Sequence, residues 1–331
     1  MLALNPSKAT GPDGIPGWLL KENADILAGP VMSVINSSFL ESRLPISWKE
    51  ADIVPIPKQK PVNDVNKDLQ PISLTPVLSK ITEEYVVECF LKSDVMKKAD
   101  PNKFGKLPGL NTTYAHISML HKWNSDTDGN SATVRIVLFD FKKAFDLIDH
   151  NILIQKLVWY EIPSNVVNWI IDFLLNRKQR VKLSQDCVSE WGLVPAGVPQ
   201  GTKLGPWLFL VMINDLNVPN HLMWKYVDDS TISETISKDE ISQIQSTVDE
   251  FVCKSRIEKF VLNERKCKEM RISFTKSEKD FLPVMINNVP LEVVPHAKIL
   301  GLNVSDNLKW NYHVNEIIKK SSKRLYFLTQ L

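Results

Sequence analysis

The spacing of hydrophobic residues changes along the chain, and each period predicts a different kind of element. Near the N-terminus, a helical spacing predicts a helix whose apolar face carries Leu27, Val31, Val34, Ile35 and Phe39. At the other end, "HVNEIIKKSSKRLYFLTQL" predicts a basic amphipathic helix. Between them the helical spacing recurs, and it is interrupted by runs that alternate with a period of two.

Residues typical of helix ends predict where further helices begin. "TPVLSKITEEYVVECF" predicts a helix with Thr75 as its N-cap and Pro76 at its first helical position. The region at about 151–175 predicts two helices, because Pro163 and Ser164 break the pattern and start a second one. Another helix is expected at about 242–260.

The alternating runs predict strands between these helices. "TVRIVLFD" is rich in β-branched residues and predicts a strand that ends on Asp140. "QRVKLSQDCVSEWGLV" and "HLMWKYVDDSTIS" predict hairpins, and "KEMRISF" and "PVMINNVPLEVV" predict further strands. The prolines of "DIVPIPKQKPVNDVN" suit an edge strand or irregular coil. Strands and helices do not alternate strictly, so the sequence predicts the α+β class, in contiguous subdomains without a flexible linker.

Composition narrows the class of protein. The chain has 331 residues, is 44% hydrophobic and carries a formal net charge of +2. It is therefore expected to fold around one large core or two to three smaller ones, and its net charge alone does not indicate nucleic-acid binding. The four cysteines lack CxxC spacing, so reduced intracellular thiols are expected. No signal peptide and no apolar run of about 18 residues is found, so no membrane partner is expected.

Two adjacent acids interrupt the apolar hairpin pattern of "HLMWKYVDDSTIS". Asp228 and Asp229 could form a solvated turn, because aspartate is a favoured turn residue. Asp140, however, ends a strongly apolar strand, and a strand end can bring a third carboxylate to the same place. Asp146 and Asp149 follow on the next turn or helix and are expected to be structural or solvated. Three converging carboxylates suit hard divalent cations, and two such ions can promote an in-line phosphoryl transfer.

Two further segments carry candidate chemistry. "GVPQGTKLGP" places Gly201 beside Gln200, and glycine lets the backbone approach a ligand closely, although an ordinary loop before a helix is the alternative. "NRKQRVK" has four cations and no acid, so it could hold phosphates or be a solvated basic face. Its basic residues are Arg177, Lys178, Arg180 and Lys182.

Taken in order, these segments resemble the reverse transcriptase domain of non-LTR (LINE-type) retrotransposons. Ordered blocks at compatible spacing are far more specific than one short match, and the resemblance covers nearly the whole chain. The matching blocks are "KATGPDGIP", "LQPISLTPVLSKI", "VLFDFKKAFDLIDH", "FLLNRKQRVKL", "GVPQGTKLGPWLFLVMINDL", "YVDD", "LNERKCKEM" and "KILGLNVSDNLKWNYHV".

The resemblance implies a right-hand polymerase fold within the α+β class. Fingers with an N-terminal extension are expected at 1–133 and a palm at 134–304, with a finger insertion at about 150–192. The palm would be a ferredoxin-like antiparallel sheet with helices, and 305–331 would be the start of a truncated thumb. The implied activity is an RNA-directed DNA polymerase that extends a primer 3′-hydroxyl with dNTPs by two-metal-ion nucleotidyl transfer.

The resemblance also implies roles for the acids. Asp140 and Asp228 would bind two Mg²⁺ ions, with Mn²⁺ as a possible substitute, and Asp229 would support them. Phe141 would place its backbone carbonyl near a metal. Lys266 is the best match to the lysine that protonates the pyrophosphate leaving group, and Lys268 is a rival.

Contacts with substrates are implied in the same way. Phe145 matches the bulky residue that excludes a 2′-hydroxyl, and Gln200 and Gly201 would line the pocket of the incoming nucleotide. Tyr226 and Val227 would touch the primer terminus. The four basic residues of "NRKQRVK" would contact nucleic acid, and "KILGLNV" resembles the primer grip.

The chain departs from the family pattern at several positions. The arginine usually found before "PISL", which contacts the triphosphate, is Gln70 here, and Lys58 or Lys67 could supply the missing charge. Leu110 stands where arginine is common, and Cys253 and Glu258 replace a common tryptophan and asparagine. These departures leave open a decayed retrotransposon fragment that at most binds RNA or DNA weakly.

A cellular palm-fold relative, such as an intron maturase or a nucleotide cyclase, is a third interpretation. "FKKAFDLIDH" and "GTKLGP" argue against the cyclase, and the lack of a maturase-like C-terminal domain argues against the maturase. The partners implied by the polymerase interpretation are an RNA template, a DNA primer and dNTPs. An endonuclease domain is expected in the full element but not in this chain. The compartment, nucleus or cytoplasm, is not predicted.

Overall fold

The computed structural model describes residues 1–58, 61–105, 107–128, 132–219, 221–275 and 280–330. The chain forms two compact units, and each is described by itself. Unit 1 comprises Met1–Ala99 and Lys143–Ile213, and unit 2 comprises Asp100–Lys142 and Asn214–Leu331. Both units contain helices and a sheet, so the predicted α+β class is confirmed. The division into fingers, palm and thumb at the residues expected from the sequence stays a prediction.

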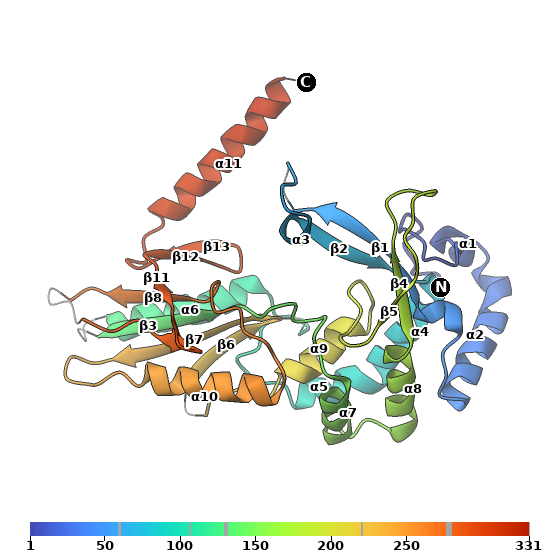
Figure 1. Cartoon of the computed structure of the whole chain (residues 1–331), viewed down its shortest axis with the longest axis horizontal. Coiled ribbons are helices and arrows are strands. Elements are labelled where there is room, and N and C mark those ends of the chain that lie inside the picture. The colour runs from blue at the N-terminus through green and yellow to red at the C-terminus, as the bar shows by residue number, and fades with distance from the viewer. Residues whose placement is uncertain (59–60, 106, 129–131, 220, 276–279, 331) are drawn as a thin grey trace. The chain divides into compact units, whose positions relative to one another are not determined.

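Unit 1 surrounds a four-stranded sheet with helices (Figure 1). Its helices are α1 (Gly17–Glu22), α2 (Ala24–Leu40), α3 (Val65–Asp68), α4 (Val77–Val86), α5 (Lys92–Lys97), α7 (His150–Trp159), α8 (Ser164–Leu174) and α9 (Gly205–Ile213). Its strands are β1 (Glu50–Pro57), β2 (Leu69–Leu74), β4 (Arg177–Val181) and β5 (Gly192–Val194). A 3₁₀ turn, Ile46–Lys49, precedes β1, and a π-helical turn, Val87–Leu91, joins α4 to α5.

Unit 2 is built on a five-stranded sheet with the order β11-β8-β3-β7-β6. Its strands are β3 (Thr133–Phe139), β6 (Leu222–Tyr226), β7 (Asp229–Ile236), β8 (Lys268–Ser273), β9 (Met285–Ile286), β10 (Val289–Pro290), β11 (Glu292–Val293), β12 (His296–Ile299) and β13 (Leu302–Ser305). Its helices are α6 (Thr112–Thr127), α10 (Ile244–Ile257) and α11 (Asn311–Thr329). The strand, hairpins and helices expected in this part of the sequence are confirmed.

The sheet of unit 1 has the order β2-β1-β4-β5, so β1 is an inner strand and not the edge strand expected from its prolines. The explanation lies in the extent of each pairing. β4 pairs only with the first half of β1, from Glu50 to Ile53, whereas Pro55 and Pro57 lie in the second half and face only β2. Each proline lacks a backbone N–H, and here none is required on the β4 side.

Two helix predictions in unit 1 need correction. Thr75 is not the N-cap of α4: Pro76 takes that position, and the buried Thr75 hydroxyl has no hydrogen-bond partner. On α2, Val34 is exposed, whereas Phe39 is half-buried and stacks on Trp169 of α8 with ring centroids 5.2 Å apart. The apolar face of α2 is therefore narrower than the sequence spacing predicts.

The sheet of unit 2 is covered on its two faces by different helices. On one face, Met119 and Trp123 of α6 pack in a cluster with Ile136 of β3. On the other face, Phe251 of α10 packs on Phe139, with ring centroids 4.3 Å apart. Because neighbouring residues of β3 alternate between these two covered faces, most of the strand is apolar, with Arg135 as its one charged residue.

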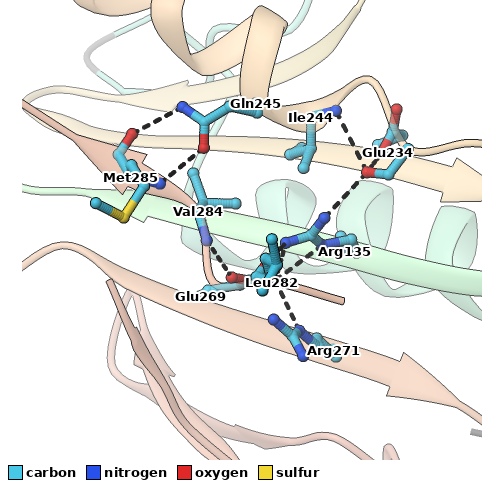
Figure 2. Close-up of polar contacts among 10 residues, drawn as sticks. Arg135, Glu234, Ile244, Gln245, Glu269, Arg271, Leu282, Val284 and Met285 are labelled. Atoms are coloured by element: carbon cyan, nitrogen blue, oxygen red, sulfur yellow. Dashed lines mark hydrogen bonds and ion pairs between the residues drawn. The ribbon is translucent and has the colours of Figure 1, made fainter. Parts of the chain in front are cut away.

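A buried ion pair joins β3 to β8 (Figure 2). Arg135 Nη2 lies 2.7 Å from Glu269 Oε1, and Glu269 is fully buried. Burial opposes ionisation of this carboxyl, but hydrogen bonds from Arg271, from the Val284 N–H and from Arg135 outweigh it and hold its pKa below the ordinary value. Arg135 also donates to the Leu282 carbonyl at 2.9 Å, so the pair ties the segment after β8 to the centre of the sheet.

The same arginine is linked to the start of α10. Arg135 Nη1 donates to Ser242 Oγ at 3.1 Å, and that hydroxyl donates to Glu234 of β7. Glu234 also accepts a hydrogen bond from the Gln243 N–H, at the N-cap of α10. The helix on this face is therefore held in place by polar contacts as well as by Phe251.

The four cysteines are free thiols, and Cys267 is the buried one. Among the helices that the structure describes, none combines the length and apolar character needed to cross a bilayer.

Candidate active site

The β6–β7 hairpin ends in a turn of two residues. Tyr226 pairs with Asp229, so Val227 and Asp228 form the turn. Val227 has a φ of 55°, whereas glycine is usual where such turns need a positive φ. This conformation is strained for a β-branched residue and persists only if the surrounding structure holds it. The two adjacent acids therefore stand at a strained hairpin tip.

The register of the sheet brings Asp140 to this tip. β3 and β7 are antiparallel, and their last pair joins Phe139 to Ser230. One further step in that register sets Asp140 opposite Asp229. Residues opposite each other on antiparallel strands have Cβ atoms roughly 4.5–5.5 Å apart. The strand-end acid and the hairpin acids thus meet at one end of the five-stranded sheet.

Segment 261–267 supports the backbone at Asp140. The Asp140 carbonyl accepts from the Asn263 N–H at 2.7 Å, and its N–H donates to Cys267 Sγ at 3.4 Å. Phe141 forms a β-bridge with Leu262. Burial raises the pKa of the Cys267 thiol to about 11, so it stays protonated and keeps its role as a neutral partner. Sequence analysis missed Asn263 and Cys267, although both lie in the matching block "LNERKCKEM".

One carboxylate oxygen of Asp140 is left without a partner. Its Oδ2 atom is buried and accepts no hydrogen bond, which is uncommon for a buried polar atom. The Nζ atom of Lys266 lies 3.9 Å from this oxygen. Lys268, the rival lysine, is instead paired with Glu292 of β11. The structure therefore places Lys266, and not Lys268, beside the acids.

The surroundings of the hairpin tip disfavour ionisation of Asp228 and Asp229. Desolvation by the surrounding protein raises the pKa of Asp229 to about 6, and the charges of Asp228 and Asp140 add to the rise. Desolvation also raises the pKa of Asp228, with a further contribution from Asp140. Asp228 and Asp229 nevertheless keep exposed surface, so water screens them and the energetic cost is small. Repulsion of this kind is relieved when a cation is bound.

The three acids have some of the features of a metal site. Within the described residues, no group of three or more His, Cys, Asp or Glu side chains is already closed around one point. The unpartnered Asp140 oxygen and the mutual repulsion of the acids still fit a cation, because carboxylate oxygens are the ligands that Mg²⁺ prefers.

Tyr226 and the primer-grip block lie around a small cavity of unit 2. The cavity, of about 60 Å³, is lined by Tyr226 and Asp229 of the hairpin and by Lys298, Ile299 and Leu300 of the β12–β13 hairpin. Val227 at the tip is half-buried. The two hairpins expected to touch a primer are therefore neighbours within this unit.

In unit 1, Phe145 and the glycine turn form a second group. The Phe145 ring stacks on Phe209 of α9 with centroids 4.4 Å apart, and its carbonyl accepts from the Val198 N–H at 2.8 Å. Gln200 donates to Asp146 at 3.2 Å, which gives Asp146 a structural partner. The other acid set aside by sequence analysis, Asp149, caps α7 through two backbone N–H groups.

Two buried contacts fix the glycine turn. Gly201 has a φ of 89°, and a Cβ atom there would lie 2.6 Å from the Ser73 carbonyl of β2, so only glycine fits. On the other side, the fully buried Glu83 of α4 accepts from the N–H groups of Lys203 and Leu204, at 2.6 and 3.2 Å. Sequence analysis missed Glu83, because the adjacent Glu84 left no local sign of which of the two acids is buried.

A groove of about 380 Å³ runs beside this turn in unit 1. Gln200 and Asp146 line it from one side, Ser73 from β2, and Lys143 and Lys178 supply cations. The groove thus combines an amide, backbone groups and positive charge, as recognition of a phosphorylated nucleotide requires.

The residues expected to replace the missing arginine are not gathered there. Gln70 is exposed on β2, and Lys58 is exposed just after β1. Neither lines the groove. The side chain of Lys67 lies outside the described residues. Lys143, which sequence analysis did not nominate, is the exposed cation nearest in sequence to Phe145 that lines it.

The basic run at 177–182 is not a continuous exposed stripe. Arg177 is buried, with its guanidinium over the Phe173 ring at 4.7 Å, and desolvation lowers its pKa to about 10. Arg180 and Lys182 pair with the buried Asp52 at 2.7 and 3.3 Å. Lys178 is exposed and lines the groove. The pattern in the sequence did not reveal these partners because Asp52 is 128 residues away from Arg180.

Comparisons with known proteins agree with this geometry. Residues 56–304 match the family described as "Reverse transcriptase (RNA-dependent DNA polymerase)". A probable RNA-directed DNA polymerase from transposon BS of Drosophila melanogaster is 25% identical over 93% of this chain and 36% of its own length. The RNA-directed DNA polymerase from mobile element jockey of Drosophila funebris is 25% identical over 95% of this chain and 35% of its own length. The resemblance to non-LTR polymerases is confirmed.

A solved structure supports the fold. Apo telomerase from Candida tropicalis, truncated from its C-terminal domain, matches with a TM-score of 0.50 and 11% identity. The match covers 80% of this chain and 55% of that chain, and at this identity it shows the fold alone. This chain spans about a third of the length of the curated relatives it matches.

Proposed function

Because this chain belongs to the reverse transcriptase family, we propose that it is an RNA-directed DNA polymerase domain that extends a primer 3′-hydroxyl with dNTPs on an RNA template. The observation that carries the proposal is the meeting of Asp140, Asp228 and Asp229 at one end of the five-stranded sheet. Members of the family use divalent metal ions. Two Mg²⁺ ions at these acids, with Mn²⁺ as a substitute, are part of the proposal.

In this proposal the three acids have different roles in metal binding. Asp140 offers its unpartnered oxygen and Asp228 offers its exposed carboxylate as ligands, while Asp229 and the backbone of Phe141 support them. When bound, the two ions would activate the primer hydroxyl and neutralise charge on the triphosphate. Lys266, exposed beside Asp140, holds the proton that the pyrophosphate leaving group takes up.

We assign the groove of unit 1 to the incoming nucleotide. Gln200, which lines the groove, would contact the base or the sugar. Gly201 and Phe145 do not line the groove but are each next in sequence to a lining residue. Gly201 would let the backbone approach the nucleotide, and Phe145, held by Phe209, would exclude a 2′-hydroxyl. Gln70 and Lys58 were expected to reach the triphosphate. Since neither lines the groove, Lys143 is the better candidate for that contact.

The exposure of each side chain indicates which residues would contact nucleic acid. Tyr226 and Val227 would meet the primer terminus, and Lys178 would contact a phosphate. Arg180 and Lys182 could contribute if Asp52 released them, whereas the buried Arg177 would act by supporting β4. The names fingers, palm and thumb, and an endonuclease domain elsewhere in the full element, belong to the same proposal.

Primer extension tests this function. The purified chain should extend oligo(dT) on poly(rA) with Mg²⁺, and Asp228→Asn should lower the rate by roughly 10²–10³-fold, on the scale of a lost electrostatic stabiliser. Asp239→Asn, the same change at an exposed loop residue of unit 2, is the matched control and should leave the rate unchanged. Extension that survives Asp228→Asn would overturn the proposal.

A non-catalytic remnant is the second candidate, and Gln70 is the residue that favours it. A protein that binds RNA or DNA in a salt-dependent way but incorporates no nucleotide would fit that candidate. If the loss lies at this position alone, Gln70→Arg should restore incorporation.

A further inference from the structure

Segment 100–105 runs along the outer edge of β6, immediately below the hairpin tip. The Lys225 N–H donates to the Asn102 carbonyl at 3.1 Å, and the Phe104 N–H donates to the Lys225 carbonyl at 2.9 Å. Lys103 forms a parallel β-bridge with Lys225. The segment therefore continues the five-stranded sheet for one short step, and we call it the brace.

The brace is pinned by a buried lysine. Lys225 is fully buried, and its Nζ lies 2.8 Å from the Asp100 carboxylate. It also donates to the Asn214 carbonyl at 2.7 Å and to the Asn217 side chain. A lysine is almost never fully buried unless its charge is paired, so the position of this ammonium is set by several partners at once.

Asn214 links Asp100 to Lys225. Its side chain accepts from the Asp100 N–H at 3.0 Å, while its carbonyl accepts from Lys225. Asn214 is itself buried and belongs to the block "GVPQGTKLGPWLFLVMINDL". Asp100 in turn accepts from the Asn102 N–H at 2.9 Å, which shapes the start of the brace.

The far end of the brace touches the strained turn. Gly105 is buried, and a Cβ atom placed there would lie 2.4 Å from the Val227 nitrogen and 2.9 Å from its Cγ2. The backbone of the turn thus rests directly on Gly105. Val227 directly precedes Asp228, so contacts that fix the backbone of Val227 also fix the position of Asp228 at the hairpin tip.

We propose that the brace, with Lys225 as its pin, is a positioning element that holds Val227 in its positive-φ conformation and so sets Asp228 for cation binding. The contacts of the brace with β6 and Val227 carry its geometry. Its effect on cation binding rests on the proposed function. Lys225, Asp100 and Gly105 act through the turn and contact neither substrate nor metal. Outer partners of this kind typically change metal affinity by about 10–100-fold when altered.

Gly105→Ala is the sharpest probe, because its methyl group meets backbone atoms that cannot rotate away. Gly29→Ala is the matched control, since a Cβ atom there meets nothing within 4 Å. Hydrogen exchange of a peptide spanning 222–236 should quicken on the order of ten-fold at the tip in Gly105→Ala, with the rest of unit 2 unchanged. Mn²⁺ affinity, followed by electron paramagnetic resonance, should fall roughly 10–100-fold.

Lys225→Met provides a second route to the same result without adding volume at the tip. Unchanged exchange at the tip and unchanged Mn²⁺ affinity in a folded variant would overturn the proposal. Loss of folding in both variants would also count against it, because the role would then be global. If the two variants show these effects but the unsubstituted protein extends no primer, the proposed polymerase function is refuted and the proposed role of the brace stands. If the parent binds no Mn²⁺, exchange alone decides.

Discussion

The Nζ atom of Lys266 lies 3.9 Å from the Asp140 oxygen that accepts no hydrogen bond. The separation is too long for a hydrogen bond but short enough for each charge to influence the other. Because Lys266 remains largely exposed, it can move toward a substrate without breaking a structural contact. Lys268 lacks this freedom, since Glu292 holds it.

This difference predicts distinct effects of two matched lysine substitutions. Lys266→Met should slow single-turnover nucleotide incorporation by roughly 10²–10⁴-fold, the range of general acid catalysis. Lys268→Met should have little effect on the rate. An unchanged rate in Lys266→Met would show that another group supplies the proton.

The raised pKa of Asp229 predicts how pH acts on the metal-free protein. Desolvation, with the charges of Asp228 and Asp140, raises this pKa to about 6, above the unfolded value of 3.8. The carboxyl therefore favours the folded state below pH 3.8, and that contribution is lost as the pH rises through about 6. Asp229→Asn should melt like the parent at pH 3.5 and at a higher temperature at pH 7.5, measured in a chelator. Equal melting temperatures at both pH values would contradict the shift.

Metal binding should follow the opposite course. A cation needs the ionised carboxylate, so Mn²⁺ affinity should weaken as the pH falls below about 6 and binding should release protons. Calorimetry in buffers of different ionisation enthalpy measures that release directly. Asp229→Asn should release fewer protons than the parent, whereas Asp239→Asn should match it.

The buried Arg135–Glu269 pair predicts a large stability effect. Glu269→Gln leaves Arg135 without its carboxylate in the interior, and breaking such a pair costs about 3–5 kcal/mol of unfolding free energy. Urea unfolding measures the loss. The exposed Glu316–Lys319 pair on α11 is the control, and Glu316→Gln should leave the unfolding curve unchanged. A small effect of Glu269→Gln would mean that neutral acceptors, such as the Leu282 carbonyl and water, suffice for Arg135.

The basic residues of β4 should separate into two classes. Lys178→Ala should reduce the slope of log affinity against log salt for an RNA–DNA duplex by about one, as expected for one lost phosphate contact. Arg177→Ala should leave that slope unchanged and lower stability, because Arg177 packs on Phe173 and bonds its carbonyl at 3.0 Å. A reduced slope in Arg177→Ala would show that the side chain leaves the interior to bind.

Local pattern predicted the strand that ends on Asp140 and the hairpin that carries Asp228, because apolar periodicity and turn chemistry are local properties. It did not predict the brace, since the pairing of Asp100 with Lys225 depends on contacts between distant segments. The basic run of β4 looked like a phosphate-binding surface for the same reason. A charge pattern is identical whether its partner is solvent, nucleic acid or a buried Asp52.

The proline-bearing half of β1 has a consequence for behaviour in solution. Beyond Ile53 the strand receives no pairing from β4, and such a margin would ordinarily invite another polypeptide to add itself to the sheet. Pro55 and Pro57 withhold the donors that an added strand would need. The same residues that misled the prediction of an edge strand therefore guard this part of the molecule against aggregation.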